Sequence, residues 1–179
     1  MFNRIFKHKF ISVDVNINKQ KTNEIRKLMK KKFRLSINHS VYLEEFKQGN
    51  KTHIDDLFFL IQNKKNNISN THPPSKNDHN KFCCDHPYRV WFLVYEDKKL
   101  YGSIYITNEN SIGINFLDMK GKWNKEIIQH IIQNITPMPA KPSLVQKSFY
   151  CNVPPDDKEF IELLEQIGAK VSQISYKFK

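Results

Sequence analysis

The strongest constraint on the fold is a block of three β-strand patterns between residues 89 and 117. Residues 89–95 (RVWFLVY) and 100–107 (LYGSIYIT) are rich in aromatic and β-branched side chains and flank a short polar segment. This arrangement predicts an antiparallel β-hairpin. Residues 111–117 (SIGINFL) predict a third strand soon afterwards. The centre of the chain is therefore expected to form a sheet.

Helical spacing of apolar residues appears on both sides of this block. The expected helices cover residues 22–33, 52–61 with Thr52 as N-cap, a short stretch of 79–85 after Ser75, 122–134, and 155–167 followed by Gly168. Further strands are expected at 10–17, 41–46, 148–153 and 171–178. Together these patterns predict a mixed α/β fold with a central, mostly antiparallel sheet and helices on both faces.

Positive charge is concentrated near the N-terminus. The chain has 29 Lys and Arg against 18 Asp and Glu, a net charge of +11, and residues 1–50 hold 12 basic and 4 acidic residues. Residues 19–34 contain eight basic side chains and only Glu24 as an acid, which suits a polyanion such as RNA or a solvated helix face. Only four basic residues are Arg, so readout of base sequence is disfavoured.

Length and cysteine content indicate the class of protein. With 179 residues, one domain at 41–179 preceded by a basic extension at 1–40 (a strand plus a Lys-rich helix) is expected. Three cysteines are too few for a disulfide framework, so a reducing, cytoplasmic compartment is expected. Residues 1–10 contain no acid, which leaves an organelle presequence open, and no apolar run reaches the length of a membrane span.

A histidine- and cysteine-rich segment is a candidate reactive site. It contains His72, His79, Cys83, Cys84, Asp85 and His86. A structural zinc site usually has two well-spaced ligand pairs, and the second pair is missing here. A Cys–His nucleophile lacks a third group to orient it. Core packing is the favoured interpretation, and no metal site is expected.

The loop between the third strand and the following helix is a candidate phosphate site. It carries Lys120, Gly121, Lys122 and Lys125 before the helix. Free N–H groups and the positive end of the helix dipole attract phosphate at such a helix N-terminus. Many α/β loops share this pattern, so alone it is weak evidence.

Residues from about 41 to 178 resemble the GCN5-related N-acetyltransferase (GNAT) superfamily. The matching residues are Ile68-Ser69, His72-Pro73-Pro74, His79, Phe82, His86-Pro87-Tyr88-Arg89, Trp91, Gly102-Ser103-Ile104-Tyr105-Ile106, Ile112-Gly113-Ile114, Asn152, Ile167-Gly168, Gln173 and Tyr176. The resemblance implies a GNAT-like fold in which the fourth and fifth core strands splay apart. Acetyl-coenzyme A would lie in the gap, and its acetyl group would pass to a primary amine.

The resemblance also implies site residues. The pantetheine arm would pair with the fourth core strand, at Gly113, Ile114, Asn115, Phe116 and Leu117. The phosphates would lie near Lys120, Gly121, Lys122, Trp123, Asn124, Lys125 and Asp157. Asn152 would order the gap, Glu109 would act as a base through water, and His86, Tyr88 and Arg89 would line the acceptor side.

Several family positions carry other residues here. Trp123 and Lys125 stand where the phosphate loop usually has small residues, and Leu164 stands where the helix after the fifth core strand often has a tyrosine. An Asp157 carboxylate near phosphates would repel them. The alternative is therefore a catalytically lapsed GNAT-fold scaffold, or a polyanion- or RNA-binding subunit that uses residues 19–34 as its contact.

Overall fold

The computed structural model describes residues 33–34, 40–63 and 73–175, all in the compact unit Phe33–Lys179. The strand expected at 10–17 and the helix expected at 22–33, except Phe33, lie outside the described residues. Phe33 belongs instead to strand β1 (Phe33–Arg34), because it pairs with Leu43 of the neighbouring strand.

An antiparallel sheet forms the centre of this unit. Its order is β1, β2 (Val41–Glu45), β3 (Val90–Glu96), β4 (Lys99–Ile106) and β5 (Ile112–Phe116). The expected hairpin is confirmed as β3–β4. Its turn residues, Asp97 and Lys98, both have positive φ (49° and 66°), as a two-residue turn with the twist of the flanking strands requires.

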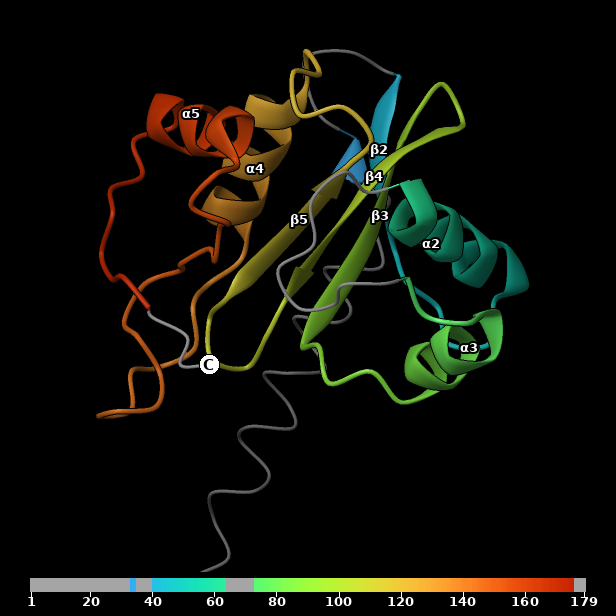
Figure 1. Ribbon diagram of the computed structural model, residues 1–179, viewed down its shortest axis with the longest axis horizontal. Helices are drawn as coiled ribbons and strands as arrows, with labels where there is room; N and C mark the ends of the chain where they lie inside the picture. Colours follow the sequence, from blue (N-terminus) through green and yellow to red (C-terminus); the bar gives the residue numbers. More distant parts are fainter. Residues whose placement is uncertain (1–32, 35–39, 64–72, 176–179) are drawn as a thin grey trace, which may run out of the picture. The chain divides into compact units, whose positions relative to one another are not determined.

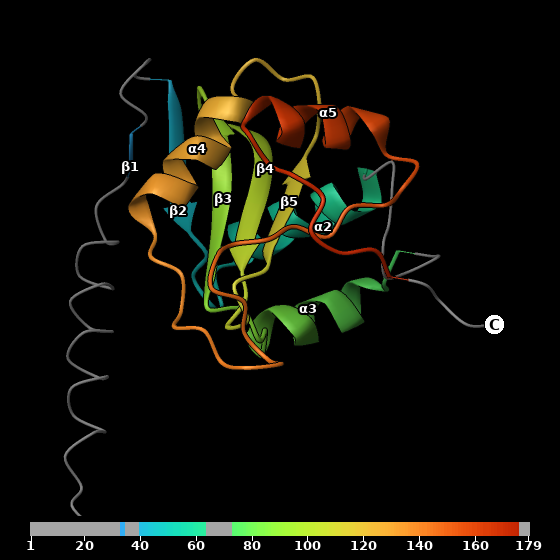
Figure 2. The same cartoon turned by 90° about the vertical axis from the view of Figure 1, so that its left-hand side faces the viewer.

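Helices cover both faces of the sheet, as expected. In Figures 1 and 2, α2 (Lys51–Asn63) and α3 (Lys76–Cys84) lie on one face, and α4 (Asn124–Asn134) and α5 (Lys158–Gln166) on the other. Side chains alternate between the faces along a strand. Trp91 and Leu93 of β3 therefore join the core under α2 and α3, while the buried side chain of the intervening Phe92 points to the opposite face, which α4 and α5 cover.

Side-chain caps fix where the helices begin. Ser75 caps α3 as expected, since its side chain accepts a hydrogen bond from the Asp78 N–H. For α2 the expected cap is wrong: Asn50, not Thr52, accepts from the N–H groups of Thr52 and His53. The expected start at Pro155 is also wrong, because Asp157 caps α5 and the helix begins at Lys158. At the other end of α5, Gly168 has the expected positive φ, 89°.

Two expected strands are not formed in the described residues. Residues 148–153 contribute only one isolated bridge, at Tyr150, and residues 171–175 have no regular structure. Val171 and Ile174 of the second segment are exposed. Alternation of apolar residues shows which side chains could share a face, but a strand also needs a neighbour along its hydrogen-bonding edge. These segments lack a continuous one within the described part of the chain.

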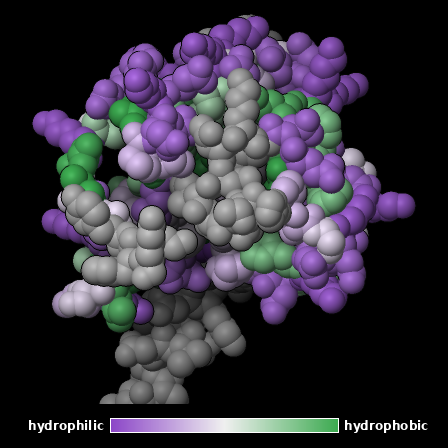
Figure 3. All heavy atoms as spheres, in the orientation of Figure 1, coloured by the Kyte–Doolittle hydropathy of each residue, from purple (hydrophilic) through white to green (hydrophobic). Residues whose placement is uncertain are grey.

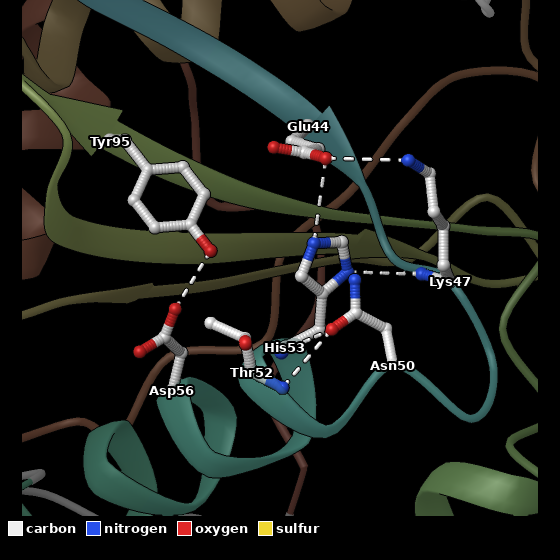
Figure 4. Close-up of polar contacts among 7 residues, drawn as sticks. All are labelled: Glu44, Lys47, Asn50, Thr52, His53, Asp56 and Tyr95. Carbon is white, nitrogen blue, oxygen red and sulfur yellow. Dashed lines mark hydrogen bonds and ion pairs between the residues drawn. The ribbon is translucent and has the colours of Figure 1, made fainter.

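Two groups of polar contacts tie α2 to β2 and β3 (Figure 4). His53 accepts the Lys47 N–H at Nδ1 (3.1 Å), and its Nε2 lies 3.6 Å from Glu44 Oε1. Tyr95 donates its hydroxyl to Asp56 at 2.8 Å. Burial lowers the pKa of His53, so the imidazole is held in its neutral form by the fold.

The face shown in Figure 3 is mostly hydrophilic, with hydrophobic residues in small separate groups. Among the residues that the structure describes, no helix is both long enough and apolar enough to cross a lipid bilayer.

Acidification should destabilise this fold before its carboxylates titrate. Burial lowers the pKa of His53, His79, His86 and His130. The unfolded chain therefore binds protons first, and the stability that these groups contribute is complete above about pH 6.5 and is lost as the pH falls below it. We expect the melting temperature, followed by circular dichroism, to fall between about pH 7.5 and about pH 5. A flat or rising melting temperature would contradict this.

Candidate functional site

The candidate site lies along the outer edge of β5. Ser111 and Tyr150 form a single parallel bridge, in which the Ile112 N–H donates to Tyr150 O (2.8 Å) and the Tyr150 N–H donates to Asn110 O (3.2 Å). Residues 151–154 have no strand structure, and no ladder continues beyond this bridge within the described residues. The two segments therefore meet at one end and do not pair along β5.

The register of the sheet shows which backbone groups face this open edge. Leu117 N–H donates to Tyr101 O, and Thr107 N–H donates to Ser111 O, so the odd-numbered residues of this stretch are hydrogen-bonded to β4. The backbone N–H and C=O groups of successive residues in a strand point to opposite edges. The N–H and C=O groups of Ile112, Ile114 and Phe116 therefore point away from β4. Ile112 N–H is used by Tyr150, which leaves Ile114 and Phe116 with outward backbone groups. Of residues 113–117, which were expected to pair with the pantetheine arm, Ile114 and Phe116 are thus the two whose backbone groups face the open edge.

Asn110 holds the entrance to this edge in place. Its side chain is fully buried and accepts the Met138 N–H (2.6 Å) while donating to Met138 O (2.9 Å) and Gln146 O (2.8 Å). Its φ is +69°, a conformation that asparagine tolerates better than most residues. Asn110 thus fixes the loop that delivers Tyr150 to β5.

The loop after β5 is built on internal hydrogen bonds. Asp118 accepts the N–H groups of Lys120 and Gly121, and Asn124 N–H donates to Gly121 O. The Tyr101 hydroxyl accepts the Trp123 N–H and donates to the Asn124 side chain.

These bonds narrow the expected phosphate-binding set. The amides of Gly121, Trp123 and Asn124 are engaged within the loop. Among the described residues, the N–H groups of Lys122, Lys125 and Glu126 have no acceptor. The candidate backbone donors to phosphate are therefore Lys122, just before α4, and the first turn of α4.

A β-bulge brings Tyr101 beneath the loop. Tyr95 pairs with Leu100 and Val94 with Gly102, which leaves Tyr101 as the extra residue of β4. Bulges re-aim side chains in this way. The hydroxyl comes so close to Gly121 that a Cβ there would lie 2.2 Å from it, so the loop needs glycine at this position.

Trp123 does not block the open edge of β5. Its side chain is buried, and its indole Nε1–H donates to Glu96 Oε1 at 2.7 Å, at the end of β3. β3 is separated from β5 by β4, so the ring points away from the outer edge. The lysines of the loop are exposed, and two of them form ion pairs: Lys122 with Glu96 (3.0 Å) and Lys120 with Glu159 (3.2 Å).

On the face under α2 and α3, aromatic rings reach the beginning of β5. Tyr88 stacks on Tyr105 with centroids 3.9 Å apart, and Tyr105 covers Gly113, where a Cβ would lie 2.0 Å from its ring. His86 packs against Trp91 and Tyr88. Burial raises the pKa of both Tyr88 and Tyr105, so they stay protonated, and it lowers the pKa of His86. The structure therefore brings His86 and Tyr88 together.

Other expected site residues lie elsewhere. The Arg89 guanidinium donates to Thr136 O (2.9 Å), after the end of α4, rather than joining His86 and Tyr88. Glu109 is exposed in the turn before β5. Asn152 is exposed two residues after the bridge. Asp157 accepts the Phe160 N–H at the start of α5, so its carboxylate serves as a helix cap.

The histidine–cysteine segment is part of the core. Cys83 is fully buried, 3.4 Å from His79 Nε2, and burial raises the pKa of its thiol to about 11. The thiol is therefore protonated at neutral pH and is a poor nucleophile. Within the described part of the chain, no group of three or more His, Cys, Asp or Glu side chains is placed to hold a metal ion.

Comparison with solved structures supports the fold. The crystal structure of the Campylobacter jejuni N-acetyltransferase PseH matches with a TM-score of 0.50 and 19% sequence identity, over 75% of this chain and 91% of that chain. The chain has a GNAT-like fold. At this identity the GNAT likeness concerns the fold. No protein-family model and no curated protein matches the sequence.

Three residues that shape the site were missed in the sequence. Asn110, Tyr101 and Glu96 all act through side-chain contacts with residues at least 22 positions away. Asn110 carries a weak signal, since asparagine before a strand often adopts positive φ in a turn. Nothing local distinguishes Tyr101 or Glu96 from ordinary hairpin residues.

Replacing Asn110 tests whether it builds the entrance to the site. Asn110→Ala removes three buried hydrogen bonds and disfavours the positive φ, so we expect the free energy of unfolding in urea to fall by about 2–4 kcal/mol. Asn110→Gly keeps the backbone freedom and should lose less. Equal stability of the wild type and both variants would show that these contacts do not hold the loop.

Proposed function

We propose that this protein is an N-acetyltransferase that transfers the acetyl group of acetyl-coenzyme A to a primary amine. The observation that carries the proposal is the single bridge at Ser111 and Tyr150, beyond which the backbone groups of Ile114 and Phe116 face outward. Unpaired amide groups along a strand edge suit a ligand that itself carries amides, as the pantetheine arm does. PseH, with which the chain shares its fold, is an N-acetyltransferase.

The order of elements gives the direction in which the ligand would lie. The loop with Lys120, Lys122 and Lys125 follows the carboxyl end of β5, so the phosphates belong there. The arm would run back along Phe116 and Ile114 toward the bridge. The thioester would then lie near Ile114, whose outward N–H is the first beyond the bridge and is suited to stabilise the oxyanion.

The chemistry requires a neutral amine and a departing thiolate. Acetyl-coenzyme A supplies an activated acyl group when bound. Glu109, in the turn beside the bridge, would accept the amine proton through water, and Asn152 would order the slot just beyond the bridge. Leu164 cannot act as an acid, but a thiol has a pKa of roughly 8.5 and can leave as thiolate.

The acceptor would approach from the face under α2 and α3. There the Tyr105 ring lies over Gly113, Tyr88 stacks on Tyr105, and the neutral His86 packs against Tyr88. We assign Arg89 no part in binding the acceptor, because its guanidinium donates to Thr136 O.

One observation favours the alternative of a non-catalytic module. Several loop amides are engaged internally, and Lys120 and Lys122 each have a carboxylate partner. This would weaken the hold on phosphate. A scaffold or RNA-binding role through residues 19–34 would follow if the loop binds no cofactor.

Calorimetric titration with acetyl-coenzyme A separates these functions. We expect a Kd tighter than about 1 mM, and release of free thiol when a panel of primary amines is added. The double variant Lys120→Gln/Lys125→Gln should weaken binding about tenfold, since each exposed contact with phosphate contributes up to ~1 kcal/mol. Lys76→Gln, on α3, is the matched control and should bind as the wild type does. No measurable binding by the wild type would exclude the proposed enzyme.

A further inference from the structure

Glu96, at the end of β3, connects the β3–β4 hairpin to the candidate phosphate loop. A single oxygen, Oε1, accepts the Trp123 indole N–H at 2.7 Å and lies 3.0 Å from Lys122 Nζ. Lys122 Nζ also lies 5.1 Å from the centre of the Trp123 ring. The Glu96 carboxylate, the Lys122 ammonium and the Trp123 indole thus all contact one another.

The two partners of Glu96 differ in their exposure to solvent, and so in whether they can reach a ligand. Trp123 is buried, so its bond to Glu96 fixes the path of the loop just before α4. The Lys122 side chain is 70% exposed, and among the described residues the Lys122 N–H has no acceptor. A phosphate at the loop would therefore compete with Glu96 for the Lys122 ammonium.

We propose that Glu96 is a positioning residue with two opposed effects on the phosphate loop: it anchors the loop through Trp123 and restrains Lys122 from binding the cofactor phosphates. The inference rests on the proposed function. Glu96 itself would not contact the ligand. The pKa of Glu96 is lowered, first by its hydrogen bond to Trp123 and then by Lys122, so the carboxylate is charged at neutral pH and can play both parts.

Two substitutions separate the anchoring effect from the restraining effect. Glu96→Gln keeps a carbonyl oxygen for the indole N–H but removes the charge that attracts Lys122. Glu96→Ala removes both. Asp97→Asn is the matched control: it removes the same charge one residue away, at an exposed position whose positive φ asparagine tolerates.

The anchoring effect can be measured without any cofactor. The chain has two tryptophans, so the ¹H–¹⁵N spectrum should show two indole N–H signals, and Trp123→Phe identifies one of them. We expect that signal to exchange with solvent faster in Glu96→Ala than in the wild type, and to stay slow in Glu96→Gln. Equal exchange in all three proteins would overturn the anchoring role.

The restraining effect is measured by calorimetric titration with coenzyme A. Glu96→Gln should bind about two- to fivefold more tightly than Asp97→Asn, because a partly exposed ion pair is worth up to ~1 kcal/mol. In a Lys122→Gln background, Glu96→Gln should have no more effect than Asp97→Asn. If the effect comes only from the loss of one negative charge, Glu96→Gln and Asp97→Asn will bind coenzyme A with the same affinity. That result would overturn the restraining role of Glu96 but leave the proposed function intact. Absence of binding in every protein would overturn both.

Discussion

The open edge of β5 depends on the buried side chain of Asn110. Its side-chain amide makes hydrogen bonds to three backbone groups of the segment that follows α4. Its backbone carbonyl oxygen accepts the Tyr150 N–H. These bonds bring the chain back to β5 at one point only. Because buried backbone groups must find partners, the loop has little freedom to pair further along the strand. The hydrogen bonds of Asn110 at the beginning of β5 thus keep the rest of the outer edge of β5 unpaired.

The loop at the opposite end of β5 is also held in place by side chains from other parts of the chain. The loop that leads into α4 is held from below by the Tyr101 hydroxyl and from the side by Glu96. Both residues belong to the β3–β4 hairpin, and the β-bulge of that hairpin is what aims Tyr101 at the loop. Rigid strands therefore position the loop, as is usual where a binding site is carried by loops. The buried side chain of Trp123 fits this arrangement because its indole N–H donates to the partly exposed carboxylate of Glu96.

Much of the fold could be predicted from the sequence, because periodicity reports which side chains share a face. The hairpin at residues 89–107, the strand at 111–117 and the helix at 122–134 have this local signal, and all three are present. The segments at 148–153 and 171–175 alternate in the same way but form no continuous strand, since strand formation depends on a neighbour that periodicity cannot specify. Thr52 and Pro155 were plausible helix starts for the same local reasons, and nearby Asn50 and Asp157 make the capping bonds instead.

The site was less predictable than the fold. The resemblance pointed to β5 and the loop after it, but the hydrogen-bond register was needed to separate Ile114 and Phe116 from their neighbours. The resemblance implied that Arg89 lines the acceptor side with His86 and Tyr88, but the Arg89 guanidinium donates to Thr136 O. Side chains of successive residues in an extended chain point to opposite sides, which separates Arg89 from Tyr88. Long-range contacts of Asn110, Tyr101 and Glu96 leave no periodic trace in the sequence.

Amide hydrogen exchange along β5 tests the central claim most directly. With the strand open beyond Ser111, the amides of Gly113 and Asn115, which face β4, and of Ile112, which donates to Tyr150, should exchange slowly. Those of Ile114 and Phe116 should exchange fast and become protected when acetyl-coenzyme A is added. If Ile114 and Phe116 are as protected as Ile112 without any ligand, the two segments are paired along their length and no slot for a thioester exists.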